Sequence, residues 1–371
     1  MHYTANNYQC RWLLVLCKLE VNPKQMFIKK ALNIVVFFAT LFLWGCQKDG
    51  DSDSVSRPLA FEIPQGFPSP VYNFSNNEVN SNRFELGRKL FYDPILSRDS
   101  TISCGSCHQQ AGAFSHIDHR VSHGIDNLNG TRNSPSLFNL AWHNSFFWSG
   151  GSNHIEVQPI SPIVNPTEMD ETLANVVSKL QRSSTYRNLF QSAYGSDSIT
   201  SQMMLKAMAQ FMAMLVSSNS KYDKYIRGES GGNLTAQELS GLNLFRQKCS
   251  SCHTEPLFTD LTFRNNGLDS VFTDDLGRGE ITGDPNDIGK FKVPSLRNVE
   301  VSFPYMHDGS VNTLEKVLDH YSSGVKPSST LDPSLVGGIS LTTQEKADIL
   351  SFLRTLTDNQ FLNDTRFSDP N

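Results

Sequence analysis

A motif of two cysteines and a histidine occurs twice in this chain and constrains it more than any other feature. Its copies are Cys104-Gly105-Ser106-Cys107-His108 and Cys249-Ser250-Ser251-Cys252-His253. Two cysteines three positions apart lie on one face of a helical turn, and the histidine follows directly. This spacing predicts covalent haem, because two thioethers fix the porphyrin edge while the imidazole binds the iron.

A single copy of the motif has two other interpretations, half of a zinc site and a thioredoxin-like redox pair. Zinc needs four ligands, so a lone Cys-x-x-Cys-His would have to recruit a partner. A redox pair follows a strand in a βαβ unit, and its histidine would be accidental. Two complete copies favour two covalently bound haems.

Composition indicates a globular chain that does not bind nucleic acid. The 371 residues leave room for two domains, and the 38% hydrophobic and 19% charged content is low but globular. The formal net charge of −5 argues against nucleic-acid binding and is compatible with a basic electron donor. The cysteines outside the haem motifs all lie in the first 46 residues, so no pair remains for a disulfide in the mature body.

Residues 1–45 predict an export signal. Lys29 and Lys30 precede an apolar run at 31–45, which is too short to cross a bilayer but matches a signal peptide. The run ends at Cys46 in a sequence that resembles a lipoprotein cleavage box, so Cys46 is the candidate for lipidation.

Both interpretations of this segment place the body outside the cytoplasm. A cleaved signal predicts a periplasmic lipoprotein that contacts the membrane only through its lipid anchor, and the alternative is an uncleaved membrane anchor. Met26 is a plausible true start of the chain.

Each haem motif follows a predicted helix. After a tether and lead-in loop at 46–82, an apolar stripe predicts a helix from near Arg83 that stops before Pro94. Thr235 and Glu238 form a capping box that opens the helix before the second motif. The repeated order indicates a duplicated cytochrome c unit.

The predicted fold is mainly α, with two cytochrome c-like haem domains packed face to face. We place the N-terminal domain at 83–225 and the C-terminal domain at 226–371. A third capping box, at Thr342 and Glu345, opens the helix that closes the second domain. The methionine-rich segment 203–216 is interpreted as core filling.

Further motifs lie between and after the haem motifs. Phe147–Gly151 reads Phe-Trp-Ser-Gly-Gly, Pro162–Met169 reads Pro-Ile-Val-Asn-Pro-Thr-Glu-Met, and Pro304–Gly309 reads Pro-Tyr-Met-His-Asp-Gly. With Gln158 and the two haem motifs, these segments resemble the bacterial di-haem cytochrome c peroxidase family, which includes the MauG enzymes. The resemblance covers roughly residues 80–360.

The resemblance implies a division of labour between the haems. The haem on Cys104, Cys107 and His108 would be the peroxidatic centre, and the one on Cys249, Cys252 and His253 the electron store. Trp148 would lie between them, and Gln158 and Glu168 would line the side where peroxide binds, with Glu168 moving the proton. Without the resemblance, Thr167 and Asp170 could form a helix cap that makes Glu168 an ordinary first-turn acid.

The resemblance also suggests further iron ligands. His123 would be the distal ligand of the N-terminal haem in the resting state, with His116 and His119 as rivals. Tyr321 would be the sixth ligand of the C-terminal haem, with Met306 as the alternative. A thioether raises haem potential, whereas a phenolate stabilises ferric iron.

The family pattern adds a calcium ion between the domains. Asn133 would bind it through its side chain, and Ser302 and Pro304 through backbone carbonyls. Oxygen ligands of this kind suit calcium. The alternative is an ordinary turn around Asn133 and an ordinary loop proline.

Three functions follow from these features. The first is a cytochrome c peroxidase that reduces hydrogen peroxide with electrons from a small cytochrome c or cupredoxin. The second is a MauG-like enzyme that oxidises a partner protein through high-valent iron, and Tyr321 favours it. The third is a di-haem electron carrier without catalysis, which Glu168 and Gln158 argue against. The oligomeric state stays open, with a homodimer as one option.

Overall fold

The computed structural model describes residues 59–370. The chain groups into two units, Met1–Arg57 and Pro58–Asn371, and only the second is described below. The predicted signal peptide and Cys46 therefore lie outside the described residues. Within 59–370, no helix is long and apolar enough to span a membrane. The domain boundary near residue 225 stays a prediction.

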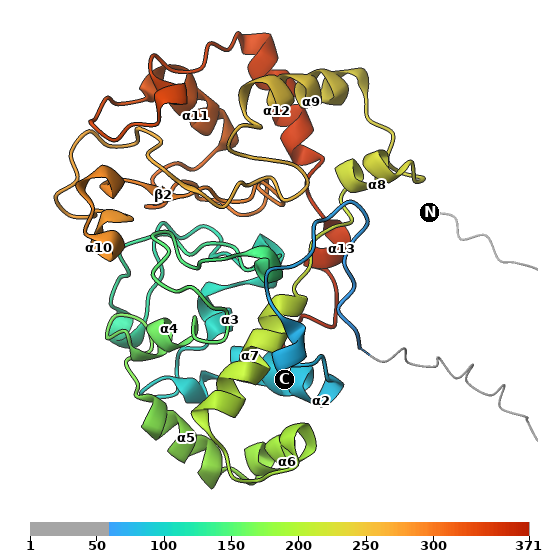
Figure 1. The fold of residues 1–371 in the computed structure, drawn as a ribbon, viewed down its shortest axis with the longest axis vertical. Helices are drawn as coiled ribbons and strands as arrows, with labels where there is room; N and C mark the ends of the chain where they lie inside the picture. The colour runs from blue at the N-terminus through green and yellow to red at the C-terminus, as the bar shows by residue number, and fades with distance from the viewer. Residues whose placement is uncertain (1–58, 371) are drawn as a thin grey trace, which may run out of the picture. The chain divides into compact units, whose positions relative to one another are not determined.

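Helices and connecting loops make up almost all of the described chain, which confirms the mainly α fold (Figure 1). The two strands, β1 (Phe263–Arg264) and β2 (Phe291–Lys292), form one short antiparallel pair. The α-helices are α2 (Ser81–Tyr92), α3 (Cys104–Cys107), α4 (Ile160–Val164), α5 (Leu173–Arg182), α6 (Ser184–Tyr194), α7 (Ser201–Met214), α8 (Lys221–Arg227), α9 (Ala236–Lys248), α10 (Gly279–Thr282), α11 (Leu314–Asp319), α12 (Thr343–Arg354) and α13 (Asn359–Leu362).

Two of the predicted capping boxes are confirmed. One opens the helix before the second motif, and the other opens the helix near the chain's end. Thr235 caps α9 and Thr342 caps α12, and each makes the reciprocal hydrogen bonds of a capping box with its glutamate. The helix expected from Arg83 begins two residues earlier, because Asn80 accepts hydrogen bonds from the first backbone N–H groups of α2. Asn80 and Thr235 thus fix where the helices that lead to the two haem motifs begin.

Two helix pairs have the same close packing, α2 with α7 and α9 with α12 (Figure 1). Gly87 of α2 lies against the backbone of Ala207, where an added Cβ would be 2.0 Å from the carbonyl oxygen. Gly241 of α9 lies against Asp348 at the same 2.0 Å. Because each pair includes the helix that precedes a haem motif, this shared contact supports a duplicated unit.

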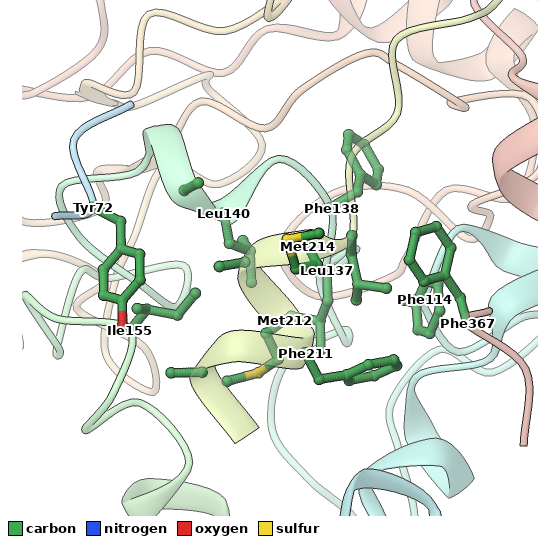
Figure 2. Packing of buried hydrophobic residues seen from close by; sticks show 14 of the residues in the cluster. Tyr72, Phe114, Leu137, Phe138, Leu140, Ile155, Phe211, Met212, Met214 and Phe367 are labelled. Atoms are coloured by element: carbon green, nitrogen blue, oxygen red, sulfur yellow. The ribbon is translucent and has the colours of Figure 1, made fainter. Parts of the chain in front are cut away.

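The methionine-rich helix α7 forms the centre of the N-terminal core. Met204, Met208, Met212 and Met214 are buried, which confirms the core-filling interpretation. Figure 2 shows Met212 and Met214 among the aromatic and aliphatic side chains of Phe114, Leu137, Leu140 and Phe211. The unbranched thioether side chains fill irregular gaps between these rings. A separate cluster, built on α9 and α12, forms the core around the second motif.

Replacing Gly241 with alanine should destabilise the protein. The new Cβ collides with the Asp348 backbone, so we expect the free energy of unfolding to fall by about 1–3 kcal/mol. This loss exceeds the gain in helix propensity of up to about 1 kcal/mol. Asn243→Ala, at an exposed position on the same helix, is the control. Urea denaturation measures both variants, and equal stability would contradict the close contact.

Candidate functional site

Both cysteine motifs line one large cavity. Its volume is about 1090 Å³, and its walls include Cys104, Cys107 and His108 together with Cys249, Cys252 and His253. Pockets for a single drug-sized ligand have volumes of about 300–1,000 Å³. The cavity is therefore larger than one small molecule requires and is suited to bulky groups attached at both motifs.

The two motif histidines are oriented in the same way. His108 Nδ1 donates a hydrogen bond to the carbonyl of Phe114 at 2.7 Å, and His253 Nδ1 lies 3.1 Å from the carbonyls of Phe258 and Pro294. A carbonyl only accepts, so Nδ1 carries the proton and Nε2 keeps its lone pair. This is the arrangement of a metal-binding histidine whose other nitrogen is held by its surroundings. The donor set therefore fits haem iron.

A second repeat supports these histidines, and the sequence analysis missed it. Residues 135–139 and 294–298 share the pattern Pro-Ser-Leu-x-Asn. Pro294 accepts from His253, and Pro135 is the corresponding backbone partner of His108. The asparagines that end the two segments both have a left-handed backbone, with φ of 54° and 56°. A search for internal repeats would have found this signal.

The two alternative interpretations of the motif do not fit the structure. The four motif cysteines form no disulfide, and burial raises the pKa of the Cys104 and Cys249 thiols to about 12. A redox pair needs a thiol with a lowered pKa. Within the described part of the chain, no cluster of three or more His, Cys, Asp or Glu side chains could hold a metal ion, which argues against zinc.

Glu168 lines the cavity near the first motif. Its charge acts on the Cys104 and Cys107 thiols, and its Oε1 accepts a hydrogen bond of 2.7 Å from Asn165 Nδ2. Burial raises the pKa of Glu168 above its ordinary value, and the Asn165 hydrogen bond opposes this only in part. The carboxyl group therefore takes up a proton at higher pH than an exposed glutamate does.

The alternative helix cap at Thr167 is wrong. Thr167 donates to Asn165 Oδ1 in a turn that follows α4, and the next helix, α5, is capped by Thr172. Asn165 fixes this turn with its amide side chain, because Oδ1 accepts from Thr167 N and Nδ2 donates to Glu168. Glu168 therefore belongs to a rigid turn and not to the first turn of a helix.

Gln158 and Trp148 line the same cavity. Gln158 is buried, and its side chain makes no hydrogen bond with the described residues. Trp148 Nε1 donates to the carbonyl of Asn133 at 2.8 Å, and the Asn133 N–H donates to the carbonyl of His307 at 2.8 Å. The backbone of Asn133 thus links Trp148 to the segment that contains His307.

Tyr321 and Met306 both line the cavity. Burial raises the pKa of Tyr321 to about 12, with a smaller opposing effect from its hydrogen bond with Asn266. Asn266 Nδ2 also lies 3.4 Å from Met306 Sδ. Tyr321 belongs to a π-helical turn, His320–Gly324, a feature frequent at functional sites. Which of the two side chains binds iron stays a prediction.

The three histidines of the loop after the first motif cluster together. The His116 and His119 rings stack at 4.1 Å, and His119 meets His123 edge-on at 5.6 Å. The Nδ1 atom of His123 is buried without a hydrogen-bond partner. None of the three lines the cavity, whereas Ser122 and Gly124 do. Ligation by His123 stays a prediction that requires the loop to turn its ring inward.

The three residues expected to bind calcium all line the cavity. Asn133 Nδ2 donates to the carbonyls of His119 and Arg120, which directs this amide and leaves its Oδ1 as the candidate ligand atom. Ser302 and Pro304 lie on the segment that precedes His307. Calcium binding stays a prediction.

The relatives found by sequence comparison are named either MauG or cytochrome c peroxidase. A sequence model of the family described as di-haem cytochrome c peroxidase matches residues 81–231. The chain is 33% identical over 310 residues to the methylamine utilization protein MauG of Methylophilus methylotrophus, covering 80% of this chain and 87% of that protein. It is also 33% identical over 290 residues to the cytochrome c551 peroxidase of Nitrosomonas europaea, covering 76% of this chain and 81% of that protein.

Structural comparison agrees with the sequence relatives. The crystal structure of a MauG-like protein associated with microbial copper homeostasis superposes with a TM-score of 0.78 at 35% identity, covering 84% of this chain and 99% of that one. The expected fold of two cytochrome c-like domains is thereby confirmed. This chain belongs to the di-haem cytochrome c peroxidase family, which includes the MauG proteins.

Proposed function

We propose that this protein reduces hydrogen peroxide to water with electrons from a small donor protein, a cytochrome c or a cupredoxin. Each peroxide takes up two electrons and two protons and yields two waters. The observation that carries the proposal is the Glu168 carboxyl group, which lines the cavity beside the first motif with a raised pKa. A carrier of electrons alone has no use for such a group.

The family implies two c-type haems, and the motif residues fit them. Cys104 and Cys107 would hold one haem with His108 as its iron ligand, and the second motif would hold the other. When bound, the haem irons supply the electrons that break the O–O bond of peroxide. The chain supplies access, orientation and proton transfer.

Glu168 moves the proton in this proposal. Asn165 Nδ2 occupies Oε1, so Oε2 is the oxygen that accepts the proton from one peroxide oxygen and delivers it to the other. The turn holds the carboxyl group in place, because Ile125 N donates to the Glu168 carbonyl at 2.8 Å. Gln158 orients peroxide through a neutral amide that adds no charge.

Trp148 is proposed to help electrons pass between the haems. Its indole is fixed by the Asn133 carbonyl, and its own carbonyl accepts from Lys292 N at 2.7 Å. The hydrogen bond from Lys292 joins segments that lie before and after the second motif in sequence. A fixed aromatic ring in a cavity lined by both motifs is suited to this role.

A second candidate is MauG-like oxidation of a partner protein. Tyr321 favours it, because a phenolate ligand stabilises ferric iron and a thioether does not. Relatives named MauG match over most of the chain, as peroxidases do. The two candidates differ in whether the second haem stores an electron at high potential.

Glu168→Gln should abolish most peroxide turnover while both haems stay bound. The amide cannot take up a proton, so we expect a loss of about 10²–10⁴-fold in kcat/KM. Steady-state peroxide reduction with a reduced cytochrome as donor measures the rate, and haem absorbance checks loading. Asp170→Asn is the control, because Asp170 pairs with Arg98 on the surface. An unaffected rate in Glu168→Gln would remove it from the mechanism.

Asn165→Asp should move the acid limb of the pH–rate profile to higher pH. Glu168 must be ionised to accept a proton, so kcat/KM falls as pH drops through its pKa. The substitution replaces a donor to the carboxylate with a second negative charge, and both changes raise the pKa of Glu168. Asn175→Asp is the control, since Asn175 serves Glu171. An acid limb that stays in place would show that another group titrates.

Tyr321→Met should raise the potential of the haem on the second motif, because a thioether replaces a phenolate. Redox titration followed by haem absorbance measures the shift. Tyr305→Phe is the control, because the Tyr305 hydroxyl, also on a cavity-lining residue, donates to the Val299 carbonyl. A potential unchanged by Tyr321→Met would exclude this residue as a ligand.

A further inference from the structure

Lys292, on β2, is a partly buried lysine that has no counter-charge among the described residues. Its Nζ donates to the carbonyl of Ser145 at 2.5 Å, and no carboxylate within the described residues pairs with it. Burial and the nearby charge of Arg278 lower the pKa of Lys292 to about 7. A buried ammonium that lacks an anionic partner is costly.

Lys292 differs in this respect from every other lysine or arginine that lines the cavity. Each of the others pairs with a carboxylate: Arg132 with Asp275 and Glu280, Lys248 with Glu345, and Arg264 with Asp260 and Asp332. The protein thus neutralises every positive charge that lines the cavity, except that of Lys292, with its own carboxylates. Lys292 is therefore the lining cation that is open to an anion from outside the described chain.

His143 provides a second polar group on the same cavity. Its Nδ1 is buried without a hydrogen-bond partner in the described structure. Burial and the charge of Lys292 hold the pKa of His143 well below its ordinary value, so its ring is neutral and offers one N–H donor. Phe146 lies beside both groups: its ring centroid is 5.8 Å from Lys292 Nζ and 6.2 Å from the His143 ring.

We propose that Lys292 and His143 form a binding subsite for a carboxylate, and that this carboxylate is a propionate of one of the two haems. One charged and one neutral donor match the two oxygens of a carboxylate. A porphyrin attached through thioethers at one edge carries its propionates at the opposite edge, away from the motif cysteines. Lys292 N also holds the Trp148 carbonyl, so the subsite lies beside the residue proposed for electron transfer.

The proposal rests on the haems that the family implies and not on peroxide reduction. A free anion such as phosphate or chloride shares the same binding chemistry, so the two sources must be separated. The stability of Lys292→Met should also change in opposite directions, depending on whether Lys292 is unpaired or paired with an anion. Removing an unpaired buried charge stabilises a protein, whereas removing one partner of a buried pair destabilises it.

The test compares the wild type, Lys292→Met and Lys292→Arg as holo-proteins. We expect Lys292→Met to lower the midpoint potential of one haem, because loss of a positive charge favours the ferric form. We also expect a lower Tm, and recovery of both properties in Lys292→Arg. Lys290→Met is the control, since Lys290 pairs with Asp287 outside the cavity.

Two results would overturn the proposal. The first is Lys292→Met with unchanged potentials and a raised Tm, which identifies an unpaired lysine. The second is a midpoint potential that changes with phosphate or chloride at constant ionic strength in the wild type but not in Lys292→Met. This result would identify a free anion as the ligand of Lys292. If Lys292→Met does not load both haems, the same redox titration is carried out on His143→Phe. We expect the midpoint potential of one haem to fall in this variant, and an unchanged potential would contradict the subsite.

Discussion

The structure depends on the hydrogen bond that holds Nδ1 of each motif histidine. His108 donates to Phe114, and His253 lies between Phe258 and Pro294. In each copy the Cys-x-x-Cys-His segment closes a turn, with the histidine N–H bonded to the carbonyl of the first cysteine. The turn positions the cysteines, and the backbone carbonyls set the tautomer of the ring. Both haem sites therefore depend on the loops that directly follow the motifs, and the second also depends on the distant segment at Pro294.

The two halves share a scaffold and differ in the residues that it presents. Phe147 and Met306 occupy equivalent places, each with a positive φ inside a short loop closed by a backbone bridge. The next residue is Trp148 in the first copy and His307 in the second. Glu168 serves only the first motif and Tyr321 lies near only the second. Duplication thus provides two similar sites, and a few substitutions give them different surroundings.

Electrostatics in the cavity separates structural charges from functional ones. Arg132, Lys248 and Arg264 are balanced by carboxylates and stiffen the walls. Glu168 and Lys292 lack such partners, and burial shifts the pKa of each toward its neutral form. Groups shifted in this way within a cavity are candidates for chemistry or for binding a charged ligand.

The sequence alone determined the two haem motifs, the capped helices before the second motif and at the chain's end, and the buried methionine helix, because these features depend on local spacing and hydrophobic pattern. The family resemblance of the motifs also pointed to Glu168 and Gln158. Only the tertiary structure revealed that Asn165 holds Glu168, that His123 lies off the cavity, and that Lys292 and His143 both lie beside Phe146. These relations join residues far apart in the chain or depend on how a loop turns, and neither leaves a periodic signal in sequence. Burial, which decides the protonation of Glu168 and Lys292, likewise exists only once the chain has folded.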